Sequence, residues 1–313
     1  RLVIRLSMMV HSQSFLSLSV QVSVLVLLVA IAKVSASESH ERPWIQGIPT
    51  GLPLVSKKRI SHDTNLFEFS LTSKESLESK TSNNCNLTLG IGICSCLLVS
   101  PSNNREIVRP FTPVSNRNKV GSFSLLVKQY PNGSMSKEFS KLNIGDEMLF
   151  WQIPKNIKEQ YPFGNPETIL MLAAGTGITP MFQALQRIFG EDEDDKESTS
   201  DVVLVFGCHK KSDVYLKKKL EKMKGRHPNR LKIVYAISSM NNQRRGSNFR
   251  MGRINKNMVD SICSMENIDR RNCQVWVCGP PKFYNDLCGP REETKLSGIL
   301  NELGFKEESV IKF

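Results

Sequence analysis

Residues 169–182 (ILMLAAGTGITPMF) carry the pattern with the most evident binding chemistry in the chain. Gly175 and Gly177 permit a tight turn and a close approach of the backbone to a ligand, while Thr176 and Thr179 add hydroxyl groups. The helix that should follow offers free N–H groups at its N-terminus, which suit an anion such as a pyrophosphate. The spacing departs from GxGxxG, so a purely structural turn is an equal alternative when this segment is considered alone.

A second candidate lies at residues 275–283 (VWVCGPPKF). An apolar strand brings Cys278 to its carboxyl end, where Gly279, Pro280 and Pro281 stop it. In an open α/β sheet, ligands bind at that end of the strands. On composition alone, Cys278 is better interpreted as an ordinary buried thiol.

An extended segment at residues 107–115 (IVRPFTPVS) alternates an arginine, an aromatic ring and hydroxyl residues. Because successive side chains of a strand point to opposite faces, Arg109, Phe111 and Pro113 should share one face. Arg109 would hold a phosphate through two hydrogen bonds, and Phe111 would stack on a flat ring. In isolation, an edge strand with a surface arginine explains this segment better.

A fourth candidate, residues 127–136 (VKQYPNGSMS), runs from a strand bearing Lys128 through a Pro-Asn-Gly turn. Ser134, Met135 and Ser136 then precede a helix, and small hydroxyls with free amides at such a position suit a phosphate. A simple hairpin loop is an equal alternative.

Two different patterns of elements must position these residues. Before about residue 165, short apolar runs separated by turn residues predict an antiparallel barrel, with strands at 65–71, 87–99, 122–127 and 147–153. After Pro166, continuous apolar runs alternate with helical stretches, which predicts a parallel sheet with helices on both faces. The expected strands are 169–174, 201–207, 232–238 and 274–280, and the expected helices are 180–189 and 213–224.

The chain of 313 residues therefore divides into a β-barrel domain at 57–165 and an α/β domain at 166–313, preceded by a linker at 33–56. Residues 15–32 are uncharged and apolar, which favours a membrane anchor after a polar segment at 1–14. A secretory signal peptide is the alternative, because VSA at 34–36 would serve as a cleavage site. Two polar segments, 72–84 and 190–200, are expected to be solvated loops.

The bulk composition constrains partners and compartment. The formal net charge of +12 favours an acidic partner or an anionic surface, although a solvated basic surface explains it equally well. Nucleic-acid binding is not expected, because aromatic residues are not interleaved with the basic ones. The eight cysteines include no CxxC pair and have no histidine at zinc-like spacing, so we expect reduced thiols and no metal site.

Taken in order, these motifs resemble the cytochrome b5 reductase family among the ferredoxin-reductase-like flavoenzymes. The resemblance runs from about Lys57 to the end of the chain and includes RPFTPVS, GSMS, AGTGITPM, CGPP, SHDTNLFEFSL, LNIGDEM, DVYLKKKLEKM and the terminal VIKF. It implies an FAD-binding β-barrel followed by a nicotinamide-binding α/β domain. Hydride would pass from NADH to FAD, and single electrons would then pass to a haem protein such as cytochrome b5.

The resemblance also implies residue roles. Thr112, Lys128 and Cys278 match catalytic positions, with Thr112 near the flavin N5 and Lys128 at the electronegative end of the nicotinamide–flavin pair. Asp213 matches an acid that favours NADH over NADPH. The implied cofactor-binding set is Arg109, Pro110, Phe111, Thr112, Ser115, Leu126, Lys128, Gly133, Ser134, Met135, Ser136, Gly175, Thr176, Gly177, Thr179, Asp213, Gly279, Pro280, Pro281 and Phe313.

Three positions depart from the family pattern. Phe111 stands where the family has a tyrosine, Gly92-Ile93-Cys94 replaces a GxH step, and residues 151–162 (WQIPKNIKEQYP) replace a Gly-Pro-x-Gly segment. Another diaphorase of the superfamily and a non-catalytic, membrane-tethered flavin-binding protein therefore remain alternatives. The resemblance implies catalytic domains that face the cytosol from the endoplasmic reticulum or the mitochondrial outer membrane.

Overall fold

The computed structural model describes residues 42–43, 47–74, 87–152, 163–164, 166–190, 198–239 and 248–313, and its unit from Arg42 to Phe313 contains every element discussed below. Among these residues, no helix combines the length and the hydropathy needed to cross a bilayer. The predictions for 1–14 and 15–32 lie outside the described residues, as do most of the expected loops at 72–84 and 190–200 and most of the altered segment 151–162.

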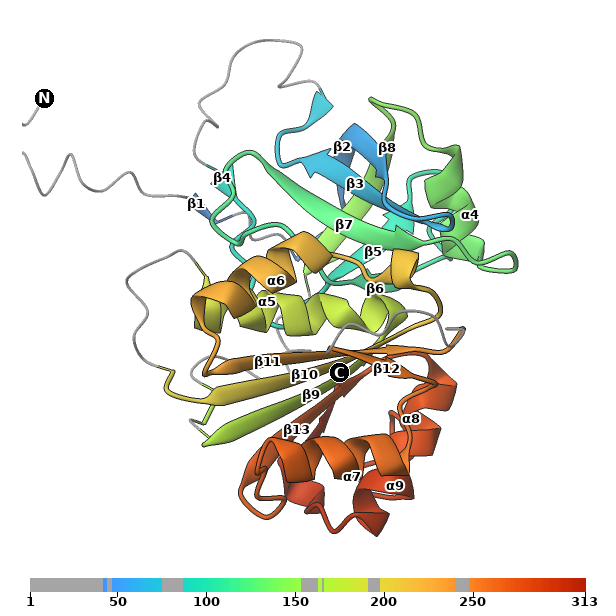
Figure 1. Ribbon diagram of the computed structural model, residues 1–313. Coiled ribbons are helices and arrows are strands. Elements are labelled where there is room, and N and C mark those ends of the chain that lie inside the picture. Colours follow the sequence, from blue (N-terminus) through green and yellow to red (C-terminus); the bar gives the residue numbers. More distant parts are fainter. Residues whose placement is uncertain are drawn as a thin grey trace, which may run out of the picture. The chain divides into compact units, whose positions relative to one another are not determined.

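The first half of the chain forms a six-stranded antiparallel sheet with the order β6-β5-β8-β2-β3-β7 (Figure 1). A bridge between Pro113, just after β6, and Leu125 in β7 brings the two outer strands together, so the sheet nearly closes into a barrel. The strands are β2 (Thr50–Arg59), β3 (Thr64–Ser70), β5 (Leu97–Pro101), β6 (Arg109–Phe111), β7 (Ser122–Lys128) and β8 (Glu147–Gln152). β1 (Arg42–Pro43) and β4 (Leu87–Thr88) form a separate parallel pair.

An aromatic cluster fills the barrel. The rings of Phe69 and Phe150 lie 4.8 Å apart, and Phe123 lies 5.1 Å from Phe150. The helix α4 (Ser134–Lys141) packs onto one end of this cluster through Phe139, whose ring lies 5.0 Å from that of Phe67. Large aromatic side chains bury much apolar area, and this cluster therefore fixes where β7 and α4 lie.

Two expectations for the barrel need correction. The predicted linker extends too far, because β2 begins at Thr50 and buries Leu52, Pro53 and Leu54. Gly51 and Pro53 are both uncommon within strands, so the composition did not indicate a strand there. The predicted strand at 87–99 is split into β4 and β5 by a turn in which Cys94 has a φ of 58°. That left-handed conformation is uncommon for a residue with a side chain, and it interrupts the strand. The antiparallel barrel and its strands near 65–71, 122–127 and 147–153 are confirmed.

The second half forms a six-stranded, all-parallel sheet with the order β12-β11-β10-β9-β13-β14. The chain runs outward from β9 to β12 on one side and returns to place β13 on the other side of β9. The carboxyl ends of β9 and β13 thus form the switch point at which such sheets bind ligands. The strands are β9 (Thr168–Ala174), β10 (Asp201–Cys208), β11 (Leu231–Ile237), β12 (Phe249–Met251), β13 (Cys273–Cys278) and β14 (Val310–Lys312).

Helices cover both faces of this sheet, as predicted (Figure 1). In β9, Ile169 and Met171 pack in the core beneath one helix layer, and Leu170 and Leu172 pack in the other core. One layer contains α5 (Ile178–Phe189) and α6 (Lys217–Arg226); the other contains α7 (Lys256–Met265), α8 (Pro281–Leu287) and α9 (Gly298–Glu302). Single 3-10 turns are η2 (Gly175–Gly177), η3 (Lys211–Asp213) and η4 (Glu307–Ser309).

The helix expected at 213–224 begins later, at Lys217, because Asp213 closes the preceding turn η3. Its carboxylate accepts a hydrogen bond from the backbone N–H of Lys210 at 3.0 Å. The break before α6 comes at Leu216, whose φ of 59° is left-handed and cannot continue a right-handed helix. Asp213 is therefore held at the carboxyl end of β10 and does not belong to the helix.

The barrel packs against the α5 side of the sheet. Leu126 of β7 belongs to the same buried cluster as Met181 and Phe182 of α5. Polar contacts reinforce this seam: the Gln183 amide donates to the Pro113 carbonyl at 2.9 Å, and the Thr64 hydroxyl donates to the Tyr215 hydroxyl at 2.9 Å. These contacts place β6 and β7 over the carboxyl ends of β9 and β13.

Candidate active site

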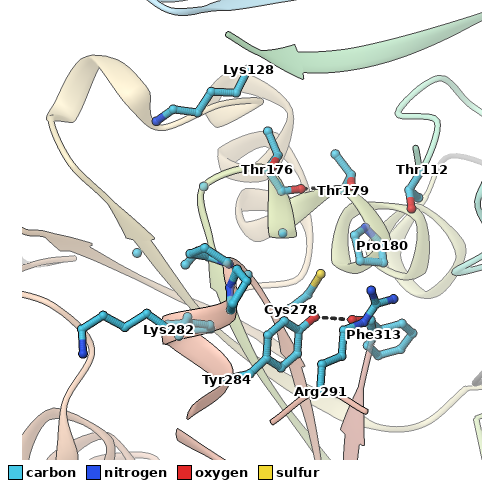
Figure 2. Close-up of a pocket in the computed structure, with 18 of the residues that line it drawn as sticks. Thr112, Lys128, Thr176, Thr179, Pro180, Cys278, Lys282, Tyr284, Arg291 and Phe313 are labelled. Atoms are coloured by element: carbon cyan, nitrogen blue, oxygen red, sulfur yellow. Dashed lines mark hydrogen bonds between the residues drawn. The ribbon is translucent and has the colours of Figure 1, made fainter. Parts of the chain in front are cut away.

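A cavity of about 1670 Å³ lies between β6, β7 and α4 of the barrel and the carboxyl ends of β9, β10 and β13 (Figure 2). Pockets for one drug-sized ligand usually measure about 300–1,000 Å³, so this cavity has room for a larger ligand or for two ligands. It brings together the four segments that the sequence singled out. Its lining includes Arg109, Pro110, Phe111, Thr112, Leu126, Lys128, Gly133, Ser134, Met135, Ser136, Gly175, Thr176, Gly177, Thr179, Asp213, Cys278, Gly279, Pro280, Pro281 and Phe313.

Ser115 alone among the predicted cofactor-binding residues does not line this cavity. Its hydroxyl accepts a hydrogen bond from the backbone N–H of Ser124 at 3.1 Å. Ser115 therefore ties the segment after β6 to β7, and it supports the cavity wall without facing the cavity.

On the barrel side, Arg109 supplies a cation at the cavity wall. Its guanidinium donates to the carbonyl of Val108 at 2.7 Å, and within the described part of the chain no carboxylate pairs with it. The Phe111 ring also lines the cavity, but it packs against Phe139 with ring centres 5.1 Å apart. Arg109 remains available to bind an anion, whereas Phe111 is partly held by the barrel core.

The N-terminus of α4 opens into the same cavity. Gly133 precedes the helix, and no side chain caps the first N–H groups. The Ser136 hydroxyl lies 3.1 Å from the Gly133 carbonyl and 3.2 Å from the Tyr130 carbonyl, so it braces the turn. A Cβ at Gly133 would lie 2.5 Å from that hydroxyl, which explains the glycine. The free N–H groups of this helix end, together with Arg109, form an anion site.

On the sheet side, the turn after β9 and the end of β13 are in direct contact. A Cβ at Gly177 would lie 2.1 Å from the carbonyl oxygen of Cys278, so the two backbones meet as closely as glycine allows. Gly175 has a φ of +58°, which also favours glycine. The Thr179 hydroxyl donates to the Thr176 carbonyl at 3.0 Å and stabilises the turn.

Cys278 lies at the centre of the cavity floor (Figure 2). Burial raises the pKa of its thiol to about 11, and the Tyr284 hydroxyl and the Arg291 guanidinium only partly oppose this effect. The thiol is therefore protonated at neutral pH, where it cannot act as a thiolate nucleophile or base. A protonated thiol at this position can shape the wall and form weak hydrogen bonds.

Alkylation of Cys278 tests this protonation state. With the pKa of the thiol near 11, its reaction with iodoacetamide should still quicken about tenfold per pH unit between about pH 8 and about pH 10. Peptide mass spectrometry measures the rate, and a small free thiol in the same solution is the control. A Cys278 rate that levels off together with that of the free thiol would show that burial does not govern its ionisation.

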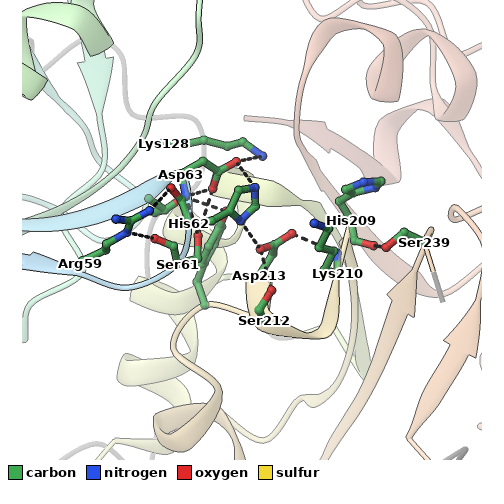
Figure 3. A network of polar contacts seen from close by, with 12 residues as sticks. Arg59, Ser61, His62, Asp63, Lys128, His209, Lys210, Ser212, Asp213 and Ser239 are labelled. Atoms are coloured by element: carbon green, nitrogen blue, oxygen red, sulfur yellow. Dashed lines mark hydrogen bonds and ion pairs between the residues drawn. The ribbon is translucent and has the colours of Figure 1, made fainter.

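A polar network connects the two domains beside the cavity (Figure 3). The Lys128 ammonium pairs with Asp63 at 3.1 Å, and the His62 ring lies 3.5 Å from Asp63 and 3.4 Å from Asp213. Burial opposes the charged form of Lys128, but Tyr215 and Asp63 raise its pKa, so it is an ammonium at neutral pH. The turn that bears His62 and Asp63 thus contacts two charged residues that line the cavity: Lys128 from the barrel and Asp213 from the sheet domain.

Sequence reasoning missed several residues of this site. His62 and Asp63 belong to the motif SHDTNLFEFSL, which implied no role for them. His62 contacts Asp213, about 150 residues later in the chain, and no local pattern reveals such a contact. Tyr215, Arg253 and Arg291 also line the cavity. Tyr215 belongs to the family motif DVYLKKKLEKM, and Arg253 and Arg291 follow Gly252 and Gly289-Pro290, but none of the three was predicted to be a site residue.

Comparisons with known proteins agree with this geometry. Residues 51–151 match the family model described as "Oxidoreductase FAD-binding domain", and residues 171–289 match "Oxidoreductase NAD-binding domain". The NADH-cytochrome b5 reductase 2 of Aspergillus terreus is 32% identical over 270 residues, which are 84% of this chain and 77% of the relative. The protein of the same name from Aspergillus clavatus is 31% identical over 282 residues, 87% of this chain and 78% of the relative.

Solved structures show the same fold. The cytochrome b5 reductase domain of Ulva prolifera nitrate reductase superposes with a TM-score of 0.67 at 24% identity, covering 87% of this chain and 99% of that one. The CS-b5R domains of human Ncb5or, in the NAD+ form, superpose with a TM-score of 0.62 at 23% identity, covering 84% of this chain and 68% of that one. The chain belongs to the NADH-cytochrome b5 reductase family, whose members are FAD- and NAD-binding oxidoreductases.

Proposed function

We propose that this protein oxidises NADH through a bound FAD and passes the electrons one at a time to a haem protein such as cytochrome b5. The observation that carries the proposal is that two anion-binding turns, one from each domain, face a single cavity. The N-terminus of α4 with Arg109 forms one of them, and the Gly175–Gly177 turn at the start of α5 forms the other. Two dinucleotides that must meet require two such turns.

The barrel wall fits FAD. Arg109 and the free N–H groups before Met135 suit a pyrophosphate, and Leu126 and Thr112 offer an apolar surface and a hydroxyl to a flat ring. Bound FAD supplies the capacity to accept a hydride and to release electrons singly. Leu126, Thr112 and Phe313, which line the cavity, would hold the ring and limit the access of water to it.

The sheet side suits NADH. The Gly175–Gly177 turn and Gly279 let the dinucleotide approach the backbone closely. Asp213 lines the cavity beyond the carboxyl end of β10, where a negative charge would disfavour the 2′-phosphate of NADPH and tolerate the 2′-hydroxyl of NADH. Lys128, held by Asp63, supplies positive charge on the opposite wall.

An acidic haem protein should be attracted by the net charge of +12. We expect NADH-driven reduction of cytochrome b5, followed in the haem absorbance, to slow severalfold between about 50 and about 500 mM salt, because salt screens such attraction. Reduction of an uncharged quinone by the same protein is the control and should change little. Equal salt responses would rule out steering by charge, and no haem reduction at any salt concentration would rule out this class of acceptor.

We also propose that residues 15–32 hold the catalytic domains at the cytosolic side of a membrane, either the endoplasmic reticulum or the mitochondrial outer membrane. This part of the proposal is supported by the uncharged apolar composition of that run.

A further inference from the structure

The loop between α8 and α9 is fixed by an unusual buried lysine. Lys312 is 8% exposed, and its ammonium donates to the carbonyls of Pro290, Glu293 and Lys295 at 3.0, 2.8 and 3.4 Å. Burial of an ammonium is costly unless its hydrogen atoms are all accepted, and here three carbonyls of a single loop accept them. The lysine therefore holds the loop in one conformation against the end of β14.

This loop presents Arg291 to the cavity. Figure 2 shows the Arg291 side chain beside Phe313, below Thr112 and Pro180. Its guanidinium lowers the pKa of Cys96 from the barrel as well as that of Cys278 from the sheet, although burial outweighs it at both thiols. Arg291 thus lies at the edge of the space between the two domains.

Arg291 is exposed, and it differs from the lysines around the cavity because no acidic partner for it exists among the described residues. Lys128 pairs with Asp63 at 3.1 Å, and Lys282 pairs with Asp286 at 3.1 Å. Across the residues that the structure describes, no hydrogen bond or ion pair involves the Arg291 side chain, including one with the neighbouring Glu292. A guanidinium carried on a fixed loop and left unpaired at a cavity wall is placed to interact with an anionic ligand.

We propose that Arg291 is an electrostatic tuning residue for the flavin, whose positive charge raises the flavin reduction potential. The inference rests on the proposed function, in which the flavin ring lies between the Thr112 wall and Phe313. Two-electron reduction with uptake of a hydride leaves negative charge on the ring system, and a cation at the ring edge stabilises that form more than the oxidised form. The size of the effect depends on the distance between the guanidinium and the ring and on screening by solvent.

The test is a spectroelectrochemical titration of the FAD-loaded protein at low ionic strength. Arg291→Gln should lower the equilibrium constant for reduction of the flavin about tenfold. For a two-electron couple, this makes the reduction potential about 30 mV more negative. Arg291→Lys keeps the charge and should largely retain the native potential. Glu292→Gln removes the opposite charge from the same loop and should not lower the potential, which separates a charge effect from a disturbance of the loop.

Three results would overturn the inference. These are an unchanged potential in Arg291→Gln, an equal fall in all three variants, and an unchanged potential accompanied by an altered salt response with cytochrome b5. The last result would assign Arg291 to the acceptor. If the native protein binds no flavin, the proposed function itself fails, and this outcome differs from a flavin that is bound but whose potential does not respond.

Discussion

Replacing Gly177 with alanine is expected to slow the reduction of the flavin by NADH severely. The new Cβ would lie 2.1 Å from the carbonyl oxygen of Cys278, 2.5 Å from its carbonyl carbon and 2.8 Å from the backbone nitrogen of Gly279. All three are backbone atoms of the turn after β13, and therefore no side-chain rotation relieves the clash. Overpacking usually costs about 1–3 kcal/mol. Here the clash also separates the two turns that shape the proposed nicotinamide site.

Anaerobic stopped-flow measurement of flavin reduction tests this expectation, and we expect a fall of at least about 100-fold, which corresponds to about 2.7 kcal/mol. Gly225→Ala is the matched control, because nothing lies within 4 Å of its added Cβ and alanine favours the helix α6. Gly175→Ala tests the backbone alone, since its φ is +58° but its surroundings are open. A Gly177→Ala protein that is reduced at the native rate would contradict the proposed contact between the two turns.

Replacing Arg109 with glutamine is expected to weaken FAD binding about 10- to 100-fold. Hydrogen bonds to charged groups contribute about 1.5–3 kcal/mol, and about 1.4 kcal/mol corresponds to tenfold in affinity. Arg109 has no carboxylate partner in the described chain, so the substitution should leave the barrel itself intact. The measurement is the dissociation constant of FAD, obtained by titrating the apoprotein with FAD and monitoring the flavin fluorescence.

Arg105→Gln serves as the control for Arg109→Gln. Arg105 is exposed just before β6 and does not line the cavity, so its loss changes the net charge equally without touching the proposed pyrophosphate site. The role assigned to Arg109 would be wrong if both variants weakened FAD binding to the same small extent, because long-range charge alone would then explain the result.

The parallel sheet was predictable because both of its faces are buried. Residues 169–174 and 202–207 are continuous apolar runs, and alternate side chains of β9 fill two separate cores. The barrel was less predictable where backbone conformation overrides composition. The run 87–99 is as apolar as a strand, but the left-handed Cys94 divides it, and Gly51 and Pro53 concealed the start of β2.

The candidate site was predictable wherever glycine, proline or a hydroxyl marks a special turn. Gly177 and Gly279 are examples, because each accommodates a close contact that a Cβ would prevent. Residues that act through long-range contacts left no such mark. His62 reaches Asp213 across the seam between domains, and Arg291 depends on Lys312, whose burial follows from the folded loop and not from any local pattern.

Anaerobic titration of the purified protein with NADH, after loading with FAD, tests the central claim most directly. If the barrel and the sheet hold the two cofactors in one cavity, the flavin absorbance should bleach in proportion to NADH and reach completion near one equivalent, while NADPH should bleach it far less at the same concentration. A protein that binds FAD but keeps its yellow colour with excess NADH would contradict the account, because the two dinucleotides would then not meet.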